Sequence, residues 1–131
     1  MHNIQIDEAV LIIRVSKLYH SAISDIELYE ITRGVWKVSG SRRESVEFVF
    51  SVYQGVVKEV YKVNSWCPAL TTLYQTRTKK DITLNGEIEM DGRWEFLGEV
   101  AEQNIRGKYI NKSVAFIFSQ GSSNPVKYIN C

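Results

Sequence analysis

The chain has 131 residues, of which 44% are hydrophobic, with 16 Lys and Arg against 15 Asp and Glu. This length suits one domain and leaves little room for two, so we expect a single domain across residues 1–131. The composition excludes wholesale disorder. The chain contains no run of eighteen apolar residues, so no membrane-spanning helix is predicted. The net charge of +1 indicates no class of partner.

The N-terminal third predicts a short strand and one clear helix. Ala9–Val15 reads AVLIIRV, a β-branched apolar run whose length favours a buried strand. Ser24-Asp25-Ile26-Glu27 is a capping box, in which the Ser24 hydroxyl accepts from the Glu27 amide and the Glu27 carboxylate reaches back to the Ser24 amide. This pattern predicts a helix over Asp25–Arg33, and we expect Gly34 to end it in a left-handed conformation.

A β-hairpin is predicted in the middle of the chain. Apolar residues alternate over Val46–Tyr53, Gln54-Gly55 supplies a tight turn, and the β-branched and aromatic run Val56–Val63 returns as a second strand. Before the hairpin, Val35–Ser39 is expected to form a brief strand or turn. An amphipathic helix over Glu44–Phe50 is the alternative that the pattern leaves open.

The second half combines loops with further strands. Thr71–Asp81 is polar and basic, which indicates a long loop. Asn85-Gly86 and Asp91-Gly92 are turn dipeptides that predict a meander, and Arg93–Ala101 is its last strand. Two more strands are expected, at Ser113–Ser119 and Val126–Ile129.

About seven strands and one clear N-terminal helix together predict an α+β fold. We expect a mostly antiparallel sheet that is curled or closed into a small β-barrel.

No catalytic motif is evident, because G-x-S-x-G, H-E-x-x-H and a Walker-type loop are all absent. His20 beside Tyr19 could act as a base, and the carboxylates of Glu87, Glu89 and Asp91 share one face of a predicted strand. A solvated histidine and a charged outer face of the sheet explain these residues without catalysis. The sequence therefore favours a binding module over an enzyme and predicts no catalytic residue, metal or cofactor.

The cysteines indicate the compartment. Cys67 and Cys131 are too few for a disulfide framework, and residues 1–8 lack the basic and then apolar layout of a signal peptide. We therefore expect reduced thiols in a cytoplasmic protein.

Charges are segregated along the chain. Residues 1–31 hold five acids and two bases, and residues 81–102 hold seven acids and one base. If the basic segments converge in the fold they form a patch suited to phosphates, whereas scattered surface charges are the alternative. One acid-free segment carries four bases: Arg33, Lys37, Arg42 and Arg43.

The three tryptophans differ in their sequence context. Trp94 alternates with apolar neighbours, which indicates a core position. Trp36 and Trp66 lie at the ends of predicted elements, where rings can line the mouth of a pocket. A base could stack there while Arg or Lys holds its phosphate, and stacking contributes about 1–3 kcal/mol per base. Core packing is the alternative for this pair.

Five segments resemble a small family of bacterial and phage proteins: LYEITRGVWKV, VYQGVVKEVYKVNSW, RWEFLGEV, IRGKYINKSV and NPVKYINC. The resemblance covers most of the chain from Leu28 onward. The order of strands, with VYQGVVKEVYKV as a hairpin, is similar to the PUA-like superfamily, including EVE and ASCH domains. The resemblance implies a small β-barrel that holds a nucleic-acid base, often a modified one, in a pocket beside a basic surface.

The sequence-based hypothesis is a nucleic-acid-binding module whose partner is DNA or RNA. In it, Arg33, Lys37, Arg42 and Arg43 contact phosphate, and Trp36 and Trp66 flank a base. The first alternative is a protein-interaction or accessory subunit whose segregated charges serve docking. The second is a small enzyme that uses the acidic residues or His20.

Overall fold

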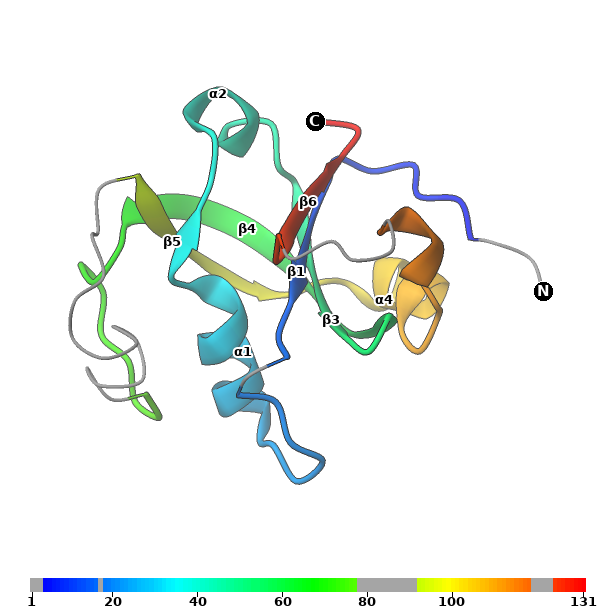
Figure 1. Ribbon diagram of the computed structural model, residues 1–131, viewed down its shortest axis with the longest axis horizontal. Helices are drawn as coiled ribbons and strands as arrows, with labels where there is room; N and C mark the ends of the chain where they lie inside the picture. The colour runs from blue at the N-terminus through cyan, green and yellow to red at the C-terminus, as the bar shows by residue number, and fades with distance from the viewer. Residues whose placement is uncertain (1–3, 17, 78–91, 119–123) are drawn as a thin grey trace.

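The computed structural model describes residues 4–16, 18–77, 92–118 and 124–131. Within them, one six-stranded sheet has the strand order β2-β5-β4-β3-β1-β6 (Figure 1). Its strands are β1 (Val10–Arg14), β2 (Trp36–Lys37), β3 (Phe48–Tyr53), β4 (Val56–Pro68), β5 (Arg93–Val100) and β6 (Val126–Ile129). The helices of this part of the chain are α1 (Asp25–Arg33), α2 (Gly40–Arg43), α4 (Gln103–Tyr109) and the 3-10 turn η1 (Ala115–Ile117).

The sheet is mixed and curls into a nearly closed barrel. β1 and β3 are parallel, and the other four strand pairs are antiparallel, which confirms the predicted α+β fold. The segment after β2 reaches the opposite edge strand, where the Ser39 amide donates to the Tyr128 hydroxyl of β6 at 2.7 Å. This curled sheet is compatible with a PUA-like architecture.

Both faces of the central strands are buried, because helices cover the two sides of the sheet (Figure 1). Along β1, Val10 and Ile12 belong to one apolar cluster, together with Tyr109 of α4. Leu11 and Ile13 belong to the other, which includes residues of α1. Such alternation follows from the two-residue period of a strand, and it explains why β1 is apolar throughout.

The predicted helix α1 has the predicted bounds, and the Glu27 amide donates to the Ser24 hydroxyl at 3.2 Å. The Glu27 carboxylate contacts His20 instead of completing the box, with Oε2 2.9 Å from the His20 Nε2. The expected left-handed Gly34 is wrong, because its φ of −169° and ψ of 161° are extended. The chain therefore passes from α1 directly into the short edge strand β2.

The predicted hairpin is confirmed as β3 and β4. Gln54 and Gly55 adopt positive φ angles of 50° and 78°, which suit the tight turn between them. β4 is longer than expected and continues to Pro68. The alternative helix over Glu44–Phe50 is wrong, because β3 begins at Phe48.

The C-terminal part departs from the sequence-based expectation in two places. The strand expected at Ser113–Ser119 is wrong, because the described part of this segment, residues 113–118, contains the 3-10 turn η1 over Ala115–Ile117. Helix α4 was not predicted. The predicted meander between Asn85 and Asp91 lies outside the described residues, whereas the strand predictions for β5 and β6 are confirmed.

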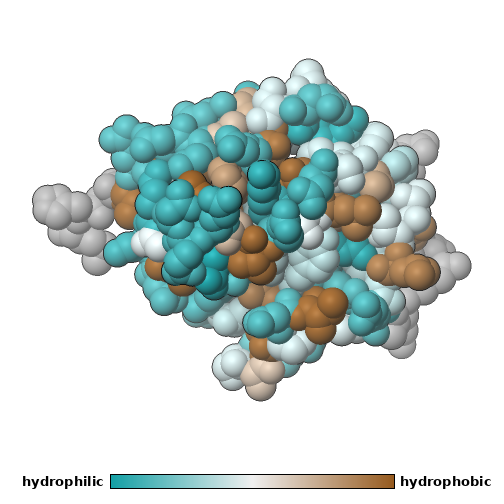
Figure 2. All heavy atoms as spheres, turned by 180° about the vertical axis from the view of Figure 1, so that it is seen from behind, coloured by the Kyte–Doolittle hydropathy of each residue, from teal (hydrophilic) through white to brown (hydrophobic). Residues whose placement is uncertain are grey.

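Polar residues cover much of the face seen from behind, and hydrophobic residues show through in separate patches (Figure 2). Within the described ranges, none of the helices has the length and apolar character that a bilayer crossing requires. Cys67 and Cys131 are both free thiols.

Candidate functional site

A pocket forms where β4 extends beyond β3. The pairing of β3 with β4 starts at Phe48 and Lys62, whereas β4 continues to pair with β5 as far as Pro68. The far part of β4 therefore has no pairing with β3 along its other edge, and the chain that follows α2 borders a pocket of about 600 Å³ there. The pocket is lined by Arg43, Glu44, Val46, Val63, Asn64, Ser65, Trp66 and Trp94.

The strand register brings the three tryptophans to one face of the sheet. Trp66 of β4 lies opposite Phe96 of β5, so these two side chains share a face of the sheet. Trp94 precedes Phe96 by two residues on β5 and therefore points to the same face. Trp36 of β2 lies opposite Trp94 and joins the same face. The Trp66 ring meets Phe96 edge to face at 5.6 Å, which anchors one aromatic wall of the pocket on the core.

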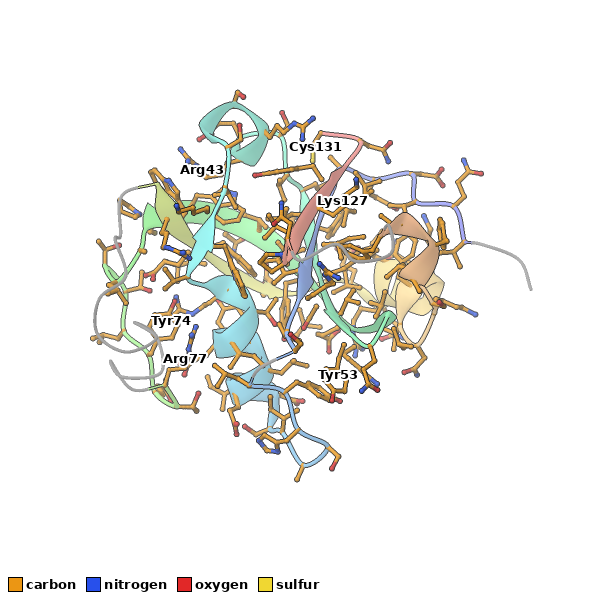
Figure 3. The ribbon with its side chains drawn as sticks, viewed as in Figure 1. Arg43, Tyr53, Tyr74, Arg77, Lys127 and Cys131 are labelled. Carbon is orange, nitrogen blue, oxygen red and sulfur yellow. The ribbon has the colours of Figure 1, made fainter. Side chains whose placement is uncertain are left out.

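The Arg43 guanidinium lies over Trp94, the other aromatic wall. Its guanidinium carbon lies 3.5 Å from the centre of the Trp94 ring, and its side chain is only 13% exposed. The Glu44 carboxylate lies 3.7 Å from Arg43 and is 77% exposed. Figure 3 shows Arg43 projecting from α2 beside the ends of β4 and β5. The site thus combines two indole rings, one guanidinium and one accessible carboxylate.

Two buried donors at this site lack a hydrogen-bond partner among the described residues. They are the indole N–H of Trp66 and the Nε–H of Arg43. Unpaired buried donors cost free energy, so an incoming acceptor that reached either one would relieve that cost.

The structure separates the two tryptophans named in the sequence-based hypothesis. Trp66 lines the pocket, whereas Trp36 does not; its indole N–H donates to the Thr32 carbonyl at 2.7 Å and ties β2 to the end of α1. Trp94, expected in the core, packs on the core and also lines the pocket. The place of Trp94 in the pocket follows from its pairing with Trp36 of β2 and Pro68 of β4. The sequence does not specify this strand register.

The predicted phosphate-contacting bases divide into two groups. Arg42 is exposed on α2 beside the pocket residue Arg43, and its guanidinium lies 4.9 Å from the Tyr128 ring. Lys37 is exposed on β2, opposite Arg93. Arg33 lies apart from them and is only 2% exposed.

Arg33 belongs to a buried polar network under the loop that follows β4. Its guanidinium donates to the Thr72 hydroxyl at 2.7 Å and to the Leu73 carbonyl at 2.6 Å. The Glu95 carboxylate, 3.8 Å away, accepts from the Leu70 amide at 2.8 Å and from the Tyr74 hydroxyl at 3.0 Å. Both terminal nitrogens of Arg33 thus donate to the protein itself, while its buried Nε–H has no partner among the described residues. The deep burial of Arg33 favours a structural role.

The Glu30 carboxylate of α1 binds the second half of the loop that follows β4. It accepts from the amides of Gln75 and Thr76 at 2.7 and 2.6 Å. Burial disfavours its charged form, but the hydrogen bonds from Thr76 and Gln75 outweigh burial and lower the pKa of Glu30. Arg77 donates to the Glu30 carbonyl at 3.1 Å, and Figure 3 shows Arg77 and Tyr74 together beside α1.

The residues considered for catalysis do not assemble into a catalytic arrangement in the described part of the chain. His20 and Glu27 pair at the surface, with side chains 51% and 33% exposed, and link the loop before α1 to its first turn. Glu87, Glu89 and Asp91 lie outside the described residues. Across residues 4–16, 18–77, 92–118 and 124–131, no three His, Cys, Asp or Glu side chains gather as metal ligands.

Neither the family models, nor the curated proteins, nor the solved structures compared with this chain match it.

Proposed function

We propose that the protein binds nucleic acid and holds an unpaired base in the pocket between Trp66 and Trp94. The observation that carries this proposal is the position of the Arg43 guanidinium over the Trp94 ring, beside a second indole ring, Trp66, in one pocket. Flat aromatic and guanidinium surfaces stack on nucleobases of any sequence. A pocket of about 600 Å³ is also large enough for a nucleotide-sized ligand.

The charge of the pocket favours a base over a cationic ligand. Paired aromatic rings can also recognise methylated ammonium groups through cation–π contacts. Here the Trp94 face already carries a cation, because the Arg43 guanidinium lies 3.5 Å above it. A second cation at that ring would meet like charge, whereas a neutral base or an anionic nucleotide would not.

Exposed basic side chains supply the attraction for phosphate. Arg42 precedes the pocket residue Arg43 on α2, with its guanidinium over the Tyr128 ring. Lys37 is exposed on the edge strand β2, where it follows Trp36 and points to the other face of the sheet. Phosphate contacts by such side chains release counterions and provide most of the affinity that does not depend on sequence. Arg33 is left out of this surface because it is buried against Glu95. A relationship to PUA-like domains belongs to the same proposal, since those domains hold bases beside basic surfaces.

Fluorescence anisotropy with labelled single- and double-stranded DNA and RNA tests the proposal. Affinity should fall with salt, with a logarithmic slope of about −0.7 to −0.9 per neutralised phosphate. Replacing Arg42 and Arg43 together by alanine should weaken binding and flatten that slope.

The matched control is the double variant Lys58→Ala/Lys112→Ala, near the first residues of β4. The Val57 amide donates to the Lys112 carbonyl, so these two lysines lie near each other at the end of β4 away from the pocket. This variant should keep the wild-type slope. If wild-type protein binds none of the probes at low salt, the proposal is wrong, and a docking role for the charged surface takes its place.

A further inference from the structure

Two polar side chains at the pocket reach it from different elements. Glu44 caps the C-terminal end of α2, and its carboxylate is 77% exposed. Asn64 lies on β4 between Val63, which pairs with Gly98, and Ser65, which pairs with Leu97. Asn64 is therefore the extra residue of a β-bulge. Bulges change the direction of side chains and are common beside binding sites.

Glu44 is the one acid among the described residues that line the pocket. An ionised carboxylate accepts hydrogen bonds through both oxygens and donates none. It therefore discriminates strongly among nucleobases, whose edges differ in their order of donors and acceptors. Because the ligand donor meets a full charge, a matched contact is stronger than one between neutral groups.

Guanine is the base whose Watson–Crick edge fits a carboxylate. Its ring N1–H and exocyclic N2–H donors lie side by side and can bind the two oxygens together. Adenine and cytosine present one amino donor beside a ring nitrogen acceptor, and thymine and uracil flank one donor with two carbonyl acceptors. In each of these four bases, an acceptor next to the donor would face a carboxylate oxygen. Two acceptors repel each other unless a proton lies between them.

We propose that the pocket selects guanine and that Glu44 is the residue that reads its Watson–Crick edge. This inference rests on the proposed function, because it requires a base between Trp66 and Trp94. The edge has to be unpaired for Glu44 to reach it, so the ligand is a guanine in a single-stranded or extruded position. Arg43 stays on Trp94 and stacks on the base, while Glu44 meets the edge of the base.

The test uses labelled thymine oligonucleotides that differ only in one central base, which is guanine, adenine, cytosine or thymine. Wild-type protein should bind the guanine probe about five- to a hundredfold tighter than the others, the range that a bidentate side-chain contact to a base provides. Glu44→Gln should remove the preference for guanine, since an amide offers one donor beside one acceptor and can pair with the Watson–Crick edge of each of the four bases. The control Glu47→Gln replaces an exposed acid that does not line the pocket, and it should keep the guanine preference.

The outcomes separate this inference from the proposed function. Equal binding of all four probes by wild-type protein would overturn the reading of guanine while leaving nucleic-acid binding in place. A wild-type preference for adenine, cytosine or thymine would overturn the role of Glu44. Absence of binding to every probe would overturn both proposals. Thermal unfolding of each variant, compared with wild type, verifies that the folded protein is being measured.

Discussion

Arg33 and Glu95 form an ion pair inside the protein, with 3.8 Å between Nη1 and Oε2 and side chains that are 3% and 0% exposed. Glu95 follows the pocket residue Trp94 directly on β5, so its side chain points to the opposite side of the strand. The Glu95 carboxylate accepts hydrogen bonds from the Leu70 and Thr72 amides in the loop after β4. Arg33 donates to the Thr72 hydroxyl in the same loop. The pair therefore joins α1, β5 and the loop behind the pocket.

Replacing Glu95 by glutamine should destabilise the protein by up to about 5 kcal/mol, because the buried Arg33 charge would lose its ion-pair partner and keep only the interaction with Glu30. Urea denaturation followed by far-ultraviolet circular dichroism measures this change. Glu99→Gln, at an exposed position on the same strand, is the matched control and should change stability by less than about 0.5 kcal/mol. Equal losses in the two variants would show that the ion pair contributes nothing specific.

Glu30 should make the protein sensitive to acid. Its pKa is lowered from the ordinary value of 4.5 because hydrogen bonds from Thr76 and Gln75 outweigh the opposing effect of burial. A carboxyl group with a lowered folded pKa stabilises the folded state above its unfolded pKa, and this contribution is lost as pH falls through the folded value.

The measurement is the free energy of unfolding of wild-type protein and Glu30→Gln from neutral pH to well below 4.5. The wild-type advantage should shrink across the acid range. Some acid sensitivity should remain in the variant, since hydrogen bonds from Lys108 and Tyr109 also lower the pKa of Glu8 against the effect of burial. A constant difference between the two proteins at every pH would contradict this role for the Glu30 charge.

The cap of α1 gives a prediction of local stability. Ser24→Ala removes the acceptor for the Glu27 amide and should cost about 1 kcal/mol. Ser21→Ala, at an exposed residue in the turn before the helix, should have little effect. An unchanged urea midpoint for Ser24→Ala would mean that the hydroxyl contributes nothing to the start of α1.

Signals local in the sequence predicted most of the elements. The capping box located the start of α1 and Gly34 marked its end, although not in the expected left-handed conformation. The apolar and β-branched runs located β1, β3, β6 and the first part of β4. Helix α4 was not predicted because its sequence carries weak helix signals. Its N-cap, Glu102, makes no side-chain cap hydrogen bond, and Gly107 lies in its interior. For η1, three apolar residues cannot distinguish a strand from a single turn.

The candidate site was predicted only in part, because it depends on register and on contacts between distant segments. Nothing in the sequence near Trp94 shows that β4 extends past β3 and leaves a pocket beside this ring. Arg33 resembled a surface base because its partners, Thr72 and Glu95, lie 39 and 62 residues further along the chain. By contrast, Arg42 and Arg43 end the short helix α2, where Arg43 lines the pocket and the Arg42 guanidinium lies over the Tyr128 ring of β6.

The close approach of β4 and β5 should make Gly98 intolerant of a side chain. A Cβ there would lie 2.2 Å from the Lys62 carbonyl oxygen, so the backbones of the two strands would have to separate. Gly98→Ala should therefore destabilise the protein by about 1–3 kcal/mol, as overpacking does. Gly107→Ala in α4 is the control: it meets no atom within 4 Å and should be neutral or stabilising. Equal stability of the two variants in urea would contradict the close strand contact.

The two tryptophans of the sequence-based hypothesis should respond differently to substitution. Trp66→Leu removes a wall of the pocket and should lower affinity for single-stranded probes by about 1–3 kcal/mol, with an unchanged salt slope because stacking releases no counterions. Trp36→Phe keeps a ring on the sheet but removes the hydrogen bond to the Thr32 carbonyl. It should cost about 0.5–1.5 kcal/mol of stability and leave affinity unchanged. Anisotropy titrations and urea denaturation of both variants separate binding from folding. If Trp36→Phe lowers affinity as much as Trp66→Leu does, the base stacks across the Trp36–Trp94 pair, and the pocket between Trp66 and Trp94 is not the binding site.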